Sequence, residues 1–242
     1  MQPTPTGPAT RRFSWGLPDT FVVWGTGFFV AAFTVGAMAA AGILTEGPGD
    51  APDLTAWGFG VVLLVQNATM LVAAWVVARV RGSGSPARDF GLRVSMRDSG
   101  WLLVGLALQI LALIALLPIA ELAGVDDAPQ EAVQRLENAG GAELALLAVG
   151  VVVIAPVVEE LVFRGLLLRS LLRRMGPGPA VGLSACLFGV IHLADPGAAV
   201  VVPGLVALGL LAGVEATRTG SLSRPILLHA GFNLLTVVVL AV

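Results

Sequence analysis

Long runs of apolar residues alternate with short polar segments along most of the chain. A helix needs roughly 20 apolar residues to cross the hydrocarbon core of a bilayer. The runs that approach or exceed this length cover residues 20–44, 56–80, 100–123, 143–174, 179–194, 198–217 and 223–241. They predict an all-α fold, a polytopic transmembrane helical bundle of about seven membrane helices, or about eight if the 143–174 run breaks at Pro156 or near Gly165. Residues 1–19 are polar and rich in Pro and Thr, so we expect a disordered leader there.

The composition agrees with a membrane protein and excludes other classes. The chain is 56% hydrophobic and 12% charged, whereas soluble domains carry about 25% charged residues. This excludes a soluble monomer, and the amount of apolar side chain excludes a disordered chain. The formal net charge of −2 argues against a nucleic-acid partner. The single cysteine, Cys186, excludes an intramolecular disulfide, and we expect it to be a small buried hydrophobe.

Basic residues are concentrated in alternate connections between the apolar runs. All 14 are arginines, and most lie before the first run, between the second and third, after residue 168, and around the connection at 218–224. The other connections are mainly acidic or neutral. Because basic residues favour the cytoplasmic side of a membrane, the pattern predicts an integral membrane protein with a cytoplasmic N-terminus. The Arg-only, Ala-, Val- and Gly-rich composition favours a bacterial plasma membrane.

Three charged residues lie inside an apolar run, where a charge costs about 2.5–3.5 kcal/mol. They are Glu159, Glu160 and Arg164. Glu160 and Arg164 are four residues apart with the acid first, the favoured arrangement for an ion pair within a helix. Glu159 points about 100° away around the helix and is left as a candidate general base. The simpler alternative is a helix end at the interface, with the charges reaching into the headgroup region.

The only two histidines of the chain also lie in apolar runs. Phe188 and His192 share one helix face, and His229 and Asn233 share another. A single intramembrane histidine is most often a hydrogen-bonded core residue, but this set of acids, imidazoles and an amide supplies a base, hydrogen-bond donors and possible metal ligands. No convincing nucleophile accompanies them, so activated water is the expected attacking group and hydrolysis the expected chemistry.

These residues form three motifs that together resemble a known family. Glu159 to Arg164 resembles its EExxxR motif, Phe188 to His192 its FxxxH motif, and His229 to Asn233 its HxxxN motif. The family is the CPBP (CAAX-processing and bacteriocin-processing, or Abi) intramembrane endopeptidases, related to the type II CAAX prenyl protease. The resemblance covers roughly residues 142–242, expected to be the catalytic core, whereas 20–141 resemble only generic transmembrane helices.

The resemblance implies a helical membrane fold with a site that opens toward the cytoplasm. It implies that Glu159 activates water with His192 beside it, and that His229 and Asn233 form the oxyanion hole. The supporting positions would be Glu160, Arg164 and Phe188.

The same resemblance leaves the use of a metal open. We expect catalysis without a cofactor; if zinc is used, its ligands would come from Glu159, Glu160, His192 and His229. The expected partners are the lipid bilayer and a membrane-associated peptide or protein substrate. Two alternatives to an endopeptidase are a non-catalytic protein of the same scaffold, acting in bacteriocin immunity or binding, and a proton-coupled transporter. No inverted repeat is visible in the sequence, which argues against the transporter.

Overall fold

The computed structural model describes residues 14–46, 52–123 and 130–240, and within these ranges the fold is predominantly helical. A two-residue antiparallel pair, β1 Thr45–Glu46 and β2 Pro52–Asp53, joins the first two long helices. The helices are α1 Leu17–Ala40, α2 Ala56–Arg81, α3 Pro86–Asp89, α4 Gly100–Ala123, α5 Glu131–Asn138, α6 Ala142–Val149, α7 Ala155–Glu160, α8 Arg169–Leu172, α9 Pro177–Ile191, α10 Val202–Thr219 and α11 Ser223–Leu240.

Each apolar run predicted from the sequence is largely covered by one helical segment, which confirms a helical membrane bundle. Within the described ranges, five segments are long and apolar enough to cross a membrane: Leu17–Ala40, Ala56–Arg81, Met96–Leu122, Ala142–Leu172 and Pro177–Ala194. Helices α10 and α11 have 18 residues each. The segment Ala142–Leu172 continues through Pro156 and Gly165, so the break that would have added an eighth span does not occur.

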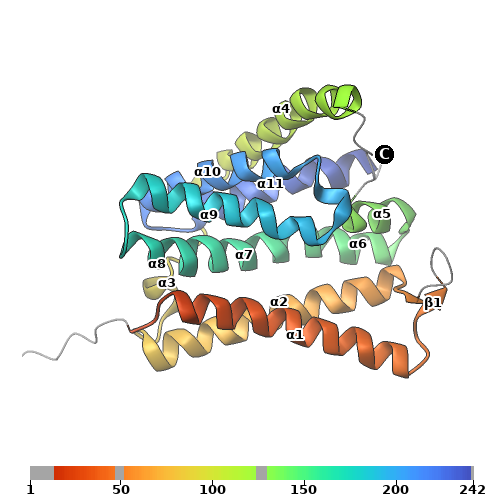
Figure 1. Cartoon of the computed structure of the whole chain (residues 1–242), viewed down its shortest axis with the longest axis horizontal. Coiled ribbons are helices and arrows are strands. Elements are labelled where there is room, and N and C mark those ends of the chain that lie inside the picture. Colours follow the sequence, from red (N-terminus) through yellow and green to blue (C-terminus); the bar gives the residue numbers. More distant parts are fainter. Residues whose placement is uncertain (1–13, 47–51, 124–129, 241–242) are drawn as a thin grey trace, which may run out of the picture.

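The predicted leader at 1–19 lies mostly outside the described residues, and α1 begins inside its predicted range, at Leu17. The segment 142–172, called the central helix below, packs on α1 and α2 on one side and on α9, α10 and α11 on the other (Figure 1). Helix α4 packs mainly on α11, and α9 packs mainly on α10. The central helix is therefore positioned to present side chains to both halves of the bundle.

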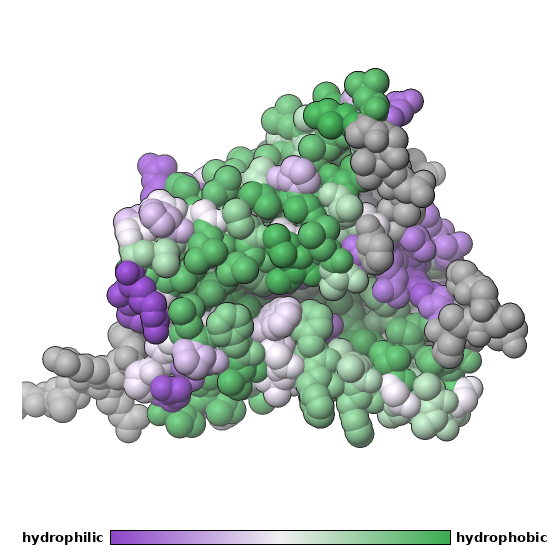
Figure 2. Space-filling model, in the orientation of Figure 1, coloured by the Kyte–Doolittle hydropathy of each residue, from purple (hydrophilic) through white to green (hydrophobic). Residues whose placement is uncertain are grey.

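Large hydrophobic side chains cover much of the outer surface, as expected for a protein surrounded by lipid. Phe29 and Phe33 on α1 are 72% and 71% exposed, and Leu122 on α4 is 89% exposed. Hydrophilic residues gather at two opposite ends of the molecule (Figure 2). Cys186 on α9 is exposed, so its predicted burial was wrong. In a bilayer a small apolar thiol can face lipid at little cost, and exposure in this structure does not mean contact with water.

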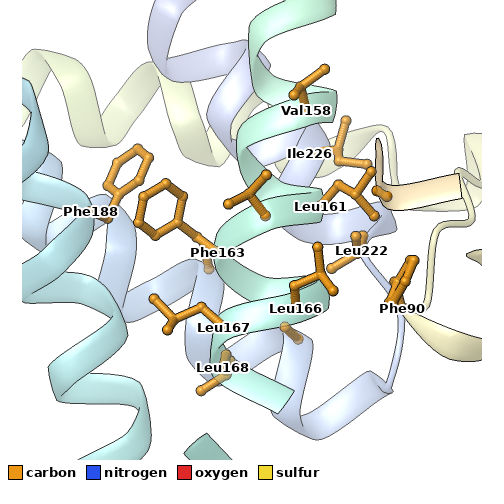
Figure 3. Close-up of a cluster of buried hydrophobic side chains, with 14 of the residues drawn as sticks. Phe90, Val158, Leu161, Phe163, Leu166, Leu167, Leu168, Phe188, Leu222 and Ile226 are labelled. Atoms are coloured by element: carbon orange, nitrogen blue, oxygen red, sulfur yellow. The ribbon is translucent and has the colours of Figure 1, made fainter. Parts of the chain in front are cut away.

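A tightly packed hydrophobic cluster surrounds the second half of the central helix (Figure 3). Phe90, Leu161, Leu166 and Leu222 are each at most 1% exposed. Phe90 follows α3, and Leu222 lies in the turn between α10 and α11, where its N–H donates to the carbonyl of Gly91 at 2.9 Å. This cluster joins two connecting loops to the second half of the central helix.

Helices α4 and α11 approach so closely that two glycines are required. A Cβ atom added at Gly105 would lie 1.9 Å from the carbonyl oxygen of Leu228, and one added at Gly231 would lie 2.0 Å from that of Leu102. Small residues commonly permit such contacts between membrane helices. The contact fixes the helix that carries His229 and Asn233.

Replacing Gly105 with leucine should therefore destabilise the fold. A side chain there meets backbone, which cannot rotate away, so we expect a loss of about 1–3 kcal/mol or more and a lower thermal unfolding midpoint in detergent. Gly182→Leu is the matched control, because a Cβ at Gly182 on α9 meets nothing within 4 Å. Equal midpoints for the two variants would contradict the close α4–α11 contact.

Candidate functional site

The predicted ion pair within the central helix is confirmed. Nη1 of Arg164 donates to Oε1 of Glu160 at 2.9 Å, and both side chains are completely buried. The guanidinium also lies over the ring of Phe188, 4.5 Å from its centroid, which is a cation–π contact. Glu160 is thus neutralised within its own helix, in agreement with its spacing from Arg164.

Glu160 also orients one of the two histidines. Nδ1 of His229 lies 3.0 Å from Oε1 of Glu160. A carboxylate that already accepts from Arg164 can only accept again, so Nδ1 of His229 carries the proton of this hydrogen bond. The other ring nitrogen, Nε2, then faces Glu159, 3.8 Å from its Oε2.

His192 is oriented by the backbone of its own helix. Nδ1 of His192 lies 2.7 Å from the carbonyl oxygen of Phe188. Since a carbonyl only accepts, Nδ1 is the donor and Nε2 is directed into the site, 4.0 Å from Oε2 of Glu159. The Phe188 ring packs against both imidazoles, at 4.9 Å from that of His192 and 5.5 Å from that of His229. Phe188 therefore contacts both histidines and Arg164 and helps to fix the planes of the two imidazoles.

Glu159 is the point on which these groups converge. Its side chain is 30% exposed, and its Oε2 has no hydrogen-bond partner among the described residues. The two imidazole nitrogens are too far from Oε2 for direct hydrogen bonds. They are close enough for a single water to bridge them to the carboxylate.

Asn233 is held against the central helix by an irregular turn. Residues Gly150–Ile154 form a π-helical turn, in which the N–H of Ala155 donates to the carbonyl of Gly150. In that register the carbonyl of Val151 should receive the N–H of residue 156, but this residue is proline and has none. Nδ2 of Asn233 donates to the Val151 oxygen instead, at 2.9 Å. The side chain thereby satisfies a backbone group and keeps one amide N–H for another partner.

A cavity of about 280 Å³ contains the candidate residues in its wall. Glu159, His192, His229 and Asn233 all line it. It extends from them to α5 and to the turn after α9, where its wall includes Gln130, Val133, Leu136, Ala194 and Asp195.

Helix α5 is fastened over this part of the cavity by polar contacts. The N–H of Glu131 donates to Oδ2 of Asp195 at 2.8 Å. Arg135 forms an ion pair with Asp53 of β2, and its hydrogen bond lowers the pKa of Asp53 below the usual value. The Asp53–Arg135 pair therefore stays charged at neutral pH and ties α5 to the segment before α2.

A second space leads from Glu159 toward the lipid. A cavity of about 120 Å³ is lined by Glu159, Trp24 and Phe163 among others. It shares Trp24 and Phe163 with a groove of about 90 Å³ between α1 and α9 that has only Thr20 as a polar residue in its lining. The surface is hollowed between these two helices (Figure 2). We call the groove between α1 and α9 the lateral groove.

The donor set does not suit a metal. Over the residues that the structure describes, no three His, Cys, Asp or Glu side chains are arranged so that they could hold a metal ion. Of the four residues considered as zinc ligands, Glu160 is occupied by Arg164 and His229. The chemistry proposed below is therefore built on the protein's own groups.

The structure brings together Glu159, Glu160, Arg164, Phe188, His192 and His229, and it places Asn233 in the same cavity wall. Sequence reasoning missed two contributors. The Val151 carbonyl could have been found from Pro156, whose missing N–H frees a carbonyl one turn earlier. No pattern in the sequence indicated that α5 forms part of the cavity wall, because α5 reaches the cavity through contacts with residues far away along the chain.

The comparisons with known proteins agree with this geometry. A family model described as "Type II CAAX prenyl endopeptidase Rce1-like" matches residues 141–235. No curated protein and no solved structure matched the chain. The matched range contains the whole central helix, α9, α10 and the part of α11 that carries His229 and Asn233. Residues 141–235 are thus similar to the type II CAAX prenyl endopeptidases of the Rce1-like family.

Proposed function

We propose that this protein hydrolyses a peptide bond of a membrane-associated substrate with a water molecule activated by Glu159. The observation that carries the proposal is the convergence of Nε2 of His192 and Nε2 of His229 on Oε2 of Glu159, at 4.0 and 3.8 Å, in a cavity wall. A base and two oriented imidazoles that converge on one carboxylate oxygen suit general-base hydrolysis.

In this mechanism Glu159 takes a proton from the water as its oxygen attacks the carbonyl carbon of the substrate. A tetrahedral oxyanion forms, and the C–N bond breaks as the same proton passes from Glu159 to the leaving amine. The Nε2 lone pair of neutral His192 can accept the second hydrogen of the attacking water and so orient it. Water, Glu159 and the substrate account for all atoms and protons of the reaction.

The oxyanion is stabilised by the groups on α11. Because Nδ1 of His229 donates to Glu160, Nε2 can donate to the oxyanion only when the ring is protonated on both nitrogens. In that form Nε2 of His229 is the first donor. The free amide N–H of Asn233 is the second donor. Donors held in this way need no rearrangement when charge develops.

A membrane-associated substrate is supported by the lateral groove, whose apolar lining suits the lipid-embedded part of a substrate. The orientation of the chain follows from its charges. The described arginines, apart from Arg135 and Arg164, lie at the end of α2, in α3, between α3 and α4, in and after α8, at the end of α10 and at the start of α11, which is one end of the bundle (Figure 1). Basic residues favour the cytoplasm. We therefore place this end and the N-terminus on the cytoplasmic side of a bacterial plasma membrane.

Replacing Glu159 with glutamine should reduce hydrolysis by about 10²–10⁴-fold, since the amide cannot take the proton from water. The assay uses purified protein in proteoliposomes with quenched fluorescent peptides: a CAAX-type peptide with and without an isoprenoid chain, and an apolar transmembrane peptide. Glu143→Gln is the matched control on the same helix, outside the cavity wall. Full activity of Glu159→Gln would rule out the general base. Proton-coupled transport by the wild type without cleavage would favour a transporter.

Asn233→Ala should lower kcat by about 10²–10³-fold, the usual effect of removing one oxyanion donor, while KM changes little. The variant also leaves the Val151 carbonyl without its partner, so its thermal unfolding is measured in parallel. A loss of stability with kcat unchanged would show that Asn233 is only a structural link between α11 and the central helix.

Chelators should leave hydrolysis unchanged, because the proposed reaction needs only water and side chains and the described residues offer no suitable metal-ligand group. The measurement is the cleavage rate after dialysis against EDTA, with metal analysis of the same sample. Loss of activity that added zinc restores would contradict this mechanism.

A further inference from the structure

A glutamine of helix α4 is buried in the wall of the site, and the proposed mechanism does not use it. Gln109 is 8% exposed and lines the cavity of about 280 Å³ that contains Glu159 in its wall. The other polar wall residues that the mechanism does not use are only half-buried; they are Gln130, Asp195 and Thr236. Gln109 is therefore a deeply placed polar group whose position needs an explanation.

The amide of Gln109 makes no hydrogen bond within the protein. Among the described residues, no group donates to this side chain or accepts from it. A primary amide offers two donors and an acceptor, and leaving them unpaired in apolar surroundings is costly. A glutamine in a membrane helix is usually explained by a hydrogen bond to a neighbouring helix, and Gln109 makes none. Its polar atoms are available to water in the cavity, and to a ligand that displaces that water.

The packing of α4 places Gln109 near the proposed oxyanion donor Asn233. Gln109 lies one helical turn after Gly105, on the same face of α4. A Cβ atom added at Gly105 would meet backbone atoms of Leu228 and Phe232 on α11. Phe232 lines the cavity together with Gln109 and directly precedes Asn233. The close contact between α4 and α11 therefore holds this amide beside the part of α11 that carries Asn233.

A second glutamine borders Glu159 from the other half of the bundle. Gln66 of α2 lines the cavity of about 120 Å³ that Glu159 also lines. Its amide likewise has no hydrogen-bond partner in the part of the chain that the structure describes. The two cavities share Leu63, Glu159 and Ile191 in their walls. Two unpartnered amides thus lie in adjoining spaces, with Glu159 at the border between them.

A peptide that is cut at Glu159 needs partners of this kind. Its scissile segment must be extended, because a carbonyl in a helix is already hydrogen-bonded within the helix. The N–H and C=O groups beside the scissile bond then need new partners, since unpaired backbone groups are costly inside a membrane. The groups assigned to the mechanism serve only the water and the scissile carbonyl. A glutamine amide, with donors and an acceptor, can bind one further peptide group.

We propose that the amides of Gln109 and Gln66 bind the substrate backbone on the two sides of the scissile bond. The proposal deepens the proposed function and rests on it for the place of cleavage. Gln109 binds a peptide group on the side of α4 and α11, and Gln66 binds one on the side of α1 and α2. Because both contacts recognise backbone, the side chains next to the scissile bond are only weakly selected by these two residues.

Peptide binding to an inactive protein tests these contacts separately from cleavage. The parent is the Glu159→Gln variant in nanodiscs, and the probes are fluorophore-labelled versions of the three peptides of the cleavage assay, with empty nanodiscs as the background. Gln109→Leu and Gln66→Leu each remove one amide from the parent. Thr69→Val is the matched control, because this hydroxyl on α2 donates to its own helix and lies outside both cavity walls.

We expect each leucine variant to bind peptide about 2–10-fold more weakly than the parent, the usual effect of losing one hydrogen bond, and Thr69→Val to bind like the parent. The thermal unfolding midpoints of the leucine variants should equal or exceed that of the parent, because an apolar side chain replaces an unpartnered amide. A glutamine that only links helices would give the opposite pattern. A lower midpoint with unchanged peptide binding would therefore overturn the proposal.

Peptides in which one backbone N–H is replaced by an ester oxygen locate the two contacts. Each replacement removes a donor, so it should weaken binding to the parent where a glutamine binds that peptide group. The position at which Gln109→Leu no longer responds should lie on one side of the scissile bond, and that for Gln66→Leu on the other. Unchanged ester sensitivity in both variants, or two positions on the same side, would overturn the proposal. Binding that depends on both glutamines without cleavage by the wild type would support it and contradict only the proposed function.

Discussion

The arrangement of the site depends on one completely buried carboxylate, that of Glu160. Desolvating an ion costs several kcal/mol, and the cost is offset only when strong partners surround it. Here a single oxygen receives Arg164 from the same helix and His229 from α11. The guanidinium stacks on Phe188, which belongs to α9. A few buried polar contacts therefore connect the three helices that carry the candidate residues and set the direction in which His229 points.

The sequence alone was sufficient to predict the structure wherever the relevant contact joins residues that are close along the chain. The Glu160–Arg164 pair and the division between the two glutamates follow from helical spacing, and the helices follow from the apolar runs. Long-range geometry was not accessible in the same way. The spacing of His192 could not reveal that α5 covers its end of the cavity, because the hydrogen bond from Glu131 to Asp195 joins residues 64 positions apart. The exposure of Cys186 was missed because the helix side that faces lipid has no polar marker.

The interpretation of Pro156 as a possible break shows how local rules are modified by tertiary structure. Proline removes a hydrogen bond from a helix, and in isolation this favours a kink or an end. The central helix continues because a π-helical turn shifts the pairing and Asn233 replaces the missing donor at Val151. The residue that would have divided the span thus fixes the position of an amide in the candidate site. Irregular helical turns are frequent at functional sites for this kind of reason.

The backbone contact between α4 and α11 has a consequence for motion. Two helices whose glycines meet opposing carbonyls slide or separate only by losing the whole interface, so His229 and Asn233 belong to a rigid part of the molecule. Helix α5 is attached differently. A few polar contacts hold it to neighbouring segments, and Gly140 and Gly141 connect it to α6, with Gly141 at a φ of +55°. The candidate groups on α11 therefore lie in the more rigid part of the cavity wall, and α5 forms a less firmly attached part.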